Sequence, residues 1–154
     1  MTAHTLEKDV VVKRINGIQK ECAALVRLGT TPFDVFNDED GTAFQLAQYH
    51  LHRALEGVFH ISAHILSRIP GGQATQYREM ARKMGEYGIV DKAFAGTKLV
   101  DMARYRNRLV HFYAEITPPE LYGILQDDLG DFETFLHAVK RVLEHPEQFG
   151  LAVE

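Results

Sequence analysis

Hydrophobic positions recur at helical spacing along most of the chain, and no stretch alternates long enough to predict a strand. A first helix is predicted from about Leu6 to Leu28, where Gly29 ends it. The next ten or so residues are predicted to form a connection. The apolar side of this first helix consists of Val11, Ile15, Ile18, Cys22, Leu25 and Val26.

A second and longer helix is predicted from about Thr42 to Ser67, because the turn-forming cluster Ile69-Pro70-Gly71-Gly72 follows it. A shorter helix is predicted from Gln76 to about Glu86. Residues 91–94 are expected to form one further turn before Gly96. The apolar stripe of the long helix consists of Leu51, Ala54, Leu55, Val58, Ile61, Ile65 and Leu66.

A fourth helix is predicted from about Thr97 until the pair Pro118-Pro119, which cannot continue it. Thr117 is a suitable N-cap for a last helix that ends near His145, with Pro118 at its first position and Glu120 completing a capping box. Four or five amphipathic helices with short links and no strands predict an all-α, up-and-down bundle.

The composition is that of an ordinary soluble domain, with 45% hydrophobic and 25% charged residues over a length of 154. We therefore expect one domain over residues 1–154. The N-terminus lacks the apolar core of a signal peptide, and no apolar run reaches the roughly 20 residues of a membrane span. The single cysteine, Cys22, cannot form an internal disulfide. A soluble, cytoplasmic protein is expected.

The net charge of −4 argues against a protein that coats nucleic acid by bulk electrostatics. A net negative charge does not exclude local basic sites. One consists of Arg104, Arg106 and Arg108, and a second consists of Arg78, Arg82 and Lys83.

The stretch RYRNRLVHFY, residues 104–113, carries the most informative chemistry. Arg106 falls in the same helical stripe as Leu99, Met102, Val110 and Tyr113, whereas Arg104, Arg108 and His111 gather on the opposite side. A guanidinium on an apolar stripe must reach water, pair with an acid, or line a cleft that a second surface completes.

An arginine and a histidine together offer the two groups needed for metal-free cleavage of an RNA phosphodiester. Arg106 would hold the phosphate and His111 would move protons. On an uninterrupted helix, however, positions five apart differ by about 140°. The helix is therefore distorted, or long side chains bridge the gap, or the two groups converge across a two-fold interface; we favour the last, which predicts a homodimer.

The residues Arg106, Asn107, His111 and Tyr113 follow the pattern R-N-x-x-x-H-x-Y. This pattern resembles the signature of the HepT-like toxins, a group within the HEPN superfamily of helical ribonucleases. The segments YREMARKMGEYGIV, residues 77–90, and LVDMARYRNRLVHFY, residues 99–113, are also similar to HepT sequences.

This resemblance implies a dimeric HEPN-like bundle with its active site in the cleft between subunits. Arg106 and His111 would be catalytic, Asn107 would orient them, and the RNA, with tRNA as the family-level expectation, would be cut without a metal or cofactor. The implied partner is a minimal nucleotidyltransferase antitoxin that adds AMP to Tyr113 and thereby blocks the site. Arg104 and Arg108 are the expected RNA-binding residues.

Three alternatives remain open. The same fold could serve as a non-catalytic module that docks a nucleotidyltransferase or binds nucleotide or RNA. The residues His52, Glu56, His60 and His64 form a ribbon at i+4 steps that could bind zinc, although a polar surface for a partner explains it better. The third alternative is that Asp127, Asp128 and Asp131 act as carboxylate ligands or acid–base groups. The solvated face of a helix explains these three aspartates better.

Overall fold

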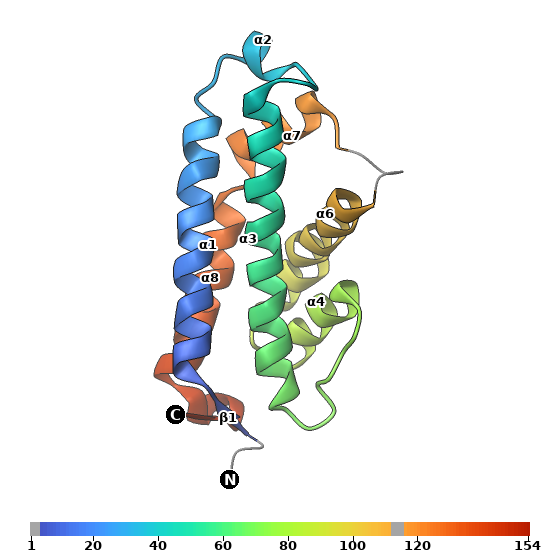
Figure 1. Cartoon of the computed structure of the whole chain (residues 1–154). Helices are drawn as coiled ribbons and strands as arrows, with labels where there is room; N and C mark the ends of the chain where they lie inside the picture. Colours follow the sequence, from blue (N-terminus) through green and yellow to red (C-terminus); the bar gives the residue numbers. More distant parts are fainter. Residues whose placement is uncertain (1–3, 112–115) are drawn as a thin grey trace.

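The structure is a computed structural model that describes residues 4–111 and 116–154. Two long antiparallel helices, α1 (Lys8–Leu28) and α3 (Thr42–Ser67), lie side by side and form the spine of the molecule. Helix α8 (Gly130–Glu144) packs against α1, and α4 (Tyr77–Glu86) and α6 (Val100–Val110) pack against α3 (Figure 1). The prediction of an all-α bundle is confirmed.

The remaining elements are short and connect these helices. Between α1 and α3 lies α2, and α7 precedes α8. A two-stranded parallel pair joins the two ends of the chain, which sequence patterning did not predict because two residues are too few to show an alternation. These elements are α2 (Phe33–Phe36), α5 (Lys92–Phe94), the π-helical turn η1 (Ala95–Leu99), α7 (Pro118–Asp127), the 3₁₀ turn η2 (Pro146–Phe149), β1 (Thr5–Leu6) and β2 (Ala152–Val153).

Helix α3 has the predicted bounds and is the central element of the core. Every residue of its predicted apolar stripe is buried, and it contacts α1, α4, α6 and α7. The first helix also lies where predicted, although Val26 is 56% exposed instead of buried. No helix within the described residues is long and apolar enough to cross a membrane.

The fourth helix differs from its prediction at both ends. It begins near Asp91, whose side chain caps the amides of Ala93 and Phe94, and it passes through Gly96 in the π-helical turn η1. It ends at Val110 instead of continuing to the prolines, because His111 has an extended backbone with φ −113° and ψ 117°. A glycine within a helix lowers its stability but does not by itself end it.

The last predicted helix is two helices. Thr117 caps α7 as predicted, since its side chain accepts a hydrogen bond from the amide of Glu120. The chain then breaks at Asp128 and starts α8 at Gly130. The two aspartates at 127 and 128 and the glycine at 130 are poor helix formers. Periodicity alone gave no sign of the break because apolar residues continue on both sides.

The spine depends on a close approach of α1 and α3 at Gly57. A Cβ atom there would lie 2.6 Å from Cγ1 of Ile18, far inside van der Waals contact. Gly17, on the facing helix, has open space where its Cβ would be. Position 17 therefore has space for a Cβ atom and position 57 does not, although both glycines lie inside helices.

We predict that Gly57→Ala destabilises the protein by about 1–3 kcal/mol, because it overpacks the interface of α1 with α3. Gly17→Ala should stabilise it by about 0.5–1 kcal/mol, because alanine favours the helix and meets no neighbour. Urea unfolding of both variants measures the difference. Equal effects would contradict the packing seen at Gly57.

Candidate active site

Arg106 lies on α6 and is held by three contacts from different parts of the chain. Its Nε donates a hydrogen bond of 2.5 Å to Oε1 of Glu56 on α3, and its Nη1 donates one of 3.3 Å to Oδ1 of Asn107. The guanidinium carbon lies 4.3 Å from the ring centre of Tyr77, the first residue of α4. The Arg106 side chain is 26% exposed, so it lines the surface without being released into water.

Tyr77 links these contacts into one cluster. Its ring stacks on Phe59 of α3 at 4.8 Å, and its hydroxyl donates a 3.2 Å hydrogen bond to Oε2 of Glu56. Each oxygen of the Glu56 carboxylate is therefore used, one by Arg106 and one by Tyr77. Glu56 holds the guanidinium at its Nε edge, and the Tyr77 ring covers one of its faces. We call this arrangement the Glu56–Tyr77 clamp.

The clamp settles which protonation states are present near neutral pH. Burial alone would raise the pKa of Glu56, but the hydrogen bond and charge of Arg106, with smaller contributions from Tyr77 and His52, lower it below its ordinary value. Burial and the charge of Glu56 raise the pKa of Tyr77. Glu56 is therefore ionised and Tyr77 protonated, which suits an arginine partner.

The open side of Arg106 faces a surface hollow of about 350 Å³ between α4 and α6. Arg78, beside the clamp on α4, brings a second guanidinium to the same hollow. Arg106 thus lines the hollow while Glu56 holds its Nε and Asn107 its Nη1. The hollow is lined by Thr75, Gln76, Tyr77, Arg78, Arg106 and Asn107.

His111 follows the last residue of α6 and is exposed. Because α6 ends at Val110, the separation of 140° expected on an uninterrupted helix does not apply to His111, and the convergence of Arg106 and His111 across a two-fold interface remains a prediction. Tyr113, the expected site of AMP addition, lies outside the described residues.

The two other arginines of the motif have different environments. Arg104 is exposed and pairs with Asp101 at 2.8 Å within α6. Arg108 reaches α7 and donates two hydrogen bonds, of 2.5 and 2.7 Å, to the carboxylate of Glu120, whose pKa they lower. Arg108 thus joins α6 to α7.

The histidine ribbon of α3 surrounds the clamp. His52 and His60 lie 3.7 and 3.5 Å from the Glu56 carboxylate, and Nε2 of His64 accepts a hydrogen bond from the amide of Glu7. Across residues 4–111 and 116–154, no group of three or more His, Cys, Asp or Glu side chains is arranged to hold a metal ion. Glu56, interpreted from its spacing as part of a polar surface, is instead the ion-pair partner of Arg106.

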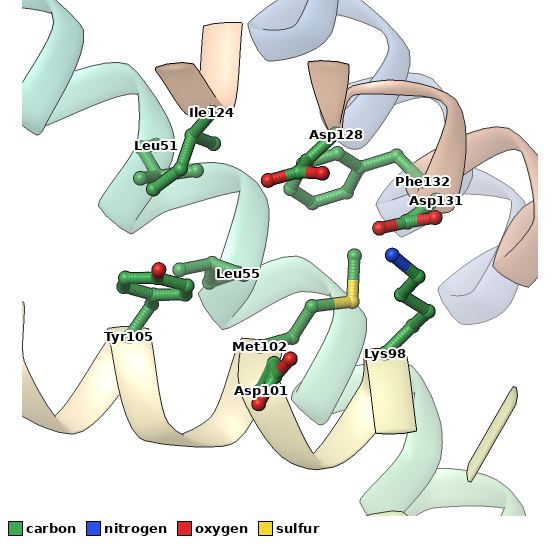
Figure 2. A pocket seen from close by; sticks show the side chains of 10 residues that line it. All are labelled: Leu51, Leu55, Lys98, Asp101, Met102, Tyr105, Ile124, Asp128, Asp131 and Phe132. Carbon is green, nitrogen blue, oxygen red and sulfur yellow. The ribbon is translucent and has the colours of Figure 1, made fainter. Parts of the chain in front are cut away.

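A second hollow lies where α3, α6, α7 and α8 meet, and Figure 2 shows its lining. Leu51, Met102 and Phe132 form part of its apolar wall, while Lys98 approaches Asp131. Burial and the nearby acids raise the pKa of Asp131, although Lys98 acts in the opposite direction. Of the three predicted surface aspartates, Asp127 is exposed, whereas Asp128 and Asp131 are half-buried and line this hollow. It contains no residue of the RYRNRLVHFY motif other than Tyr105.

Comparisons with solved structures identify the fold. A tri-AMPylated HEPN toxin from Shewanella oneidensis, solved in complex with its MNT antitoxin, is 23% identical, with a TM-score of 0.75 over 86% of this chain and 97% of that one. A toxin–antitoxin complex with AMP-PNP gives 20% identity and a TM-score of 0.75 over 86% and 98% of the chains. A mutant MntA–HpeT complex gives 19% identity and a TM-score of 0.72 over the same shares.

Curated protein sequences give no significant match to the chain. The family model described as "Ribonuclease HepT-like" matches residues 18–139, which include the clamp, Arg106 and His111. The resemblance seen in the motif is thereby confirmed over most of the length, and the chain belongs to the HepT-like ribonuclease family.

Proposed function

We propose that this protein is the RNA-cleaving toxin of a toxin–antitoxin pair, with Arg106 and His111 as its catalytic residues. The observation that carries the proposal is the Glu56–Tyr77 clamp, which orients Arg106 toward a hollow with a second arginine beside it. A guanidinium that never loses its charge and is already oriented can stabilise a pentacoordinate phosphate without reorganising.

In the proposed reaction the ribose 2′-oxygen attacks its own 3′-phosphate. The imidazole of His111 accepts the 2′-hydroxyl proton, the new O–P bond forms, and the bond to the 5′-oxygen breaks. The imidazolium formed in this way returns the proton to that 5′-oxygen, so one His111 serves each site as base and then as acid. The products are a 2′,3′-cyclic phosphate and a 5′-hydroxyl, and no metal is required because Arg106 balances the developing charge.

Asn107 and Tyr113 have supporting roles in this proposal. Asn107 holds one Nη group of Arg106 and so limits its rotation. Tyr113 would receive AMP from a minimal nucleotidyltransferase antitoxin, by analogy with the tri-AMPylated Shewanella oneidensis toxin. Bulk and negative charge near Arg106 would then exclude RNA. We propose tRNA as the first substrate to test, and the cytoplasm as the site of action.

We predict that His111→Ala and Arg106→Ala each lower RNA cleavage by at least about 10²-fold, the usual contribution of an acid–base group or a charge-stabilising donor. The assay incubates purified protein with tRNA and total RNA in excess EDTA and analyses fragment ends. Fragments with cyclic-phosphate ends that persist in both variants would contradict the assignment. Intact RNA with the unsubstituted protein would favour a non-catalytic binding module.

A mixing experiment tests whether two copies build one site. Arg106→Ala and His111→Ala proteins, each inactive alone, should recover up to about a quarter of normal cleavage when unfolded and refolded together at equal amounts, if each site takes Arg106 from one copy and His111 from the other. A mixture as inactive as its parts, with a dimer confirmed by light scattering, would place both residues of a site on the same chain.

The clamp predicts a distinct ranking of variants. Glu56→Ala should lower kcat by about 10-fold or more, because Arg106 loses the group that orients it. Tyr77→Leu should reduce cleavage more than Tyr77→Phe, which keeps the ring face under the guanidinium. Steady-state kinetics measure these values. A rise in activity for Glu56→Ala would show that Glu56 competes with the phosphate instead of positioning Arg106.

A further inference from the structure

A second basic feature lies on the other side of Glu56, in a groove of about 630 Å³ between α1 and α3. The two helices run antiparallel there, with Gly17 and Ile18 opposite Gly57. We call it the α1–α3 groove. Its polar and charged lining consists of Lys13, Arg14, Glu21, His52, Arg53, Glu56 and His60.

The charge of the α1–α3 groove is positive although the chain as a whole carries −4. Its two acids are already used: Glu21 is buried and bonds to Arg53 at 2.8 Å, and Glu56 bonds to Arg106. Lys13 and Arg14 make no ion pair with any described residue. Two cations of α1 are therefore left for an outside partner.

The groove is continuous with the proposed active site through the Glu56 carboxylate. Glu56 lines the groove and also holds Arg106, so the two sites share one side chain. His60 lies 3.5 Å from that carboxylate, and its pKa is lowered first by burial and then by the charges of both Arg14 and Arg106. The Glu56 carboxylate therefore links the groove residue His60 with Arg106.

The dimensions suit a polynucleotide strand. The residues of α1 that line the groove run from Val10 to Glu21, and those of α3 run from His52 to His60. Seven residues of helix separate Arg14 from Glu21, which is about 10 Å, or the rise of about three stacked nucleotides. Gly17 lies between these ends and has nothing within 4 Å of its Cβ position, so the groove is unobstructed at its centre.

We propose that the α1–α3 groove binds the sugar–phosphate backbone of the RNA strand whose scissile phosphate is held by Arg106. This inference rests on the proposed function and names the contacts that the substrate makes beyond the cleaved bond. A second copy of the chain is a poorer occupant, because a two-fold contact would face the same unpaired cations against each other. An acidic protein surface is the competing occupant that the experiment must exclude.

The first test measures binding of a fluorescent 12-nucleotide 2′-O-methyl RNA, which cannot be cleaved because it lacks the attacking hydroxyl. The double variant Lys13→Ala/Arg14→Ala should raise Kd at least 10-fold and reduce the slope of log Kd against log salt by about 1.4, or about 0.7 per lost phosphate contact. The control Lys8→Ala/Arg27→Ala removes two charges from the same helix outside the groove and should stay within 2-fold.

A second test adds charge without disturbing the fold. Gly17→Glu should weaken RNA binding at least 5-fold relative to Gly17→Gln, which has the same size and no charge. No atom lies within 4 Å of a Cβ at position 17, so thermal unfolding should show both variants folded. Equal binding by the two proteins, or by the double variant and its control, would overturn the proposal.

These outcomes are separable from the failure of the proposed function. Lost binding in the groove variants of a protein that does not cut RNA would support the groove and reject the ribonuclease. Normal RNA binding and cleavage together with lost binding of a nucleotidyltransferase partner would identify an acidic protein as the occupant and overturn the RNA assignment.

Discussion

The structure depends on one constraint: a permanently charged side chain on the inner side of α6 requires an acid within reach. Arg106 is 26% exposed and Glu56 is 23% exposed, so neither is free in solvent. Removing one partner would leave the other charge partly desolvated and unpaired, which is far more costly than losing a surface ion pair. The relative placement of α3, α4 and α6 is therefore tied to the geometry of a single carboxylate.

Glu56 can hold Arg106 in place because two faces of α3 have different roles. Its apolar stripe is buried in the core, while the adjoining edge carries His52, Glu56 and His60. A helix packed on both sides by other helices is fixed in rotation and translation. Glu56 is consequently placed with the precision of a core residue although it acts at the surface, as a preorganised site requires.

Much of the fold followed from local patterns, and the exceptions have physical reasons. The long helix from Thr42 to Ser67 and the Thr117 cap depend on neighbouring residues, so sequence spacing was sufficient. The proline pair did not predict that α6 ends at Val110, eight residues before it. A proline prevents a helix from continuing through it, but it does not require the helix to extend as far as the proline. The π-helical passage through Gly96 is likewise a tertiary outcome.

Only one partner of the ion pair in the candidate site, Arg106, could be recognised from the sequence. Arg106 could be recognised as a misfit on an apolar stripe, since that conflict is visible within one helix. Its partner could not, because Glu56 is fifty positions earlier and its i+4 histidines suggested a different surface. The Glu56 carboxylate that neutralises Arg106 also borders the α1–α3 groove. In the proposed RNA complex, a phosphate would therefore meet the unpaired cations of the groove before it met the paired Arg106. Binding along the groove would then offset the cost of bringing a further anion beside Glu56, which places the discrimination between a polynucleotide and a free phosphate outside the reacting centre.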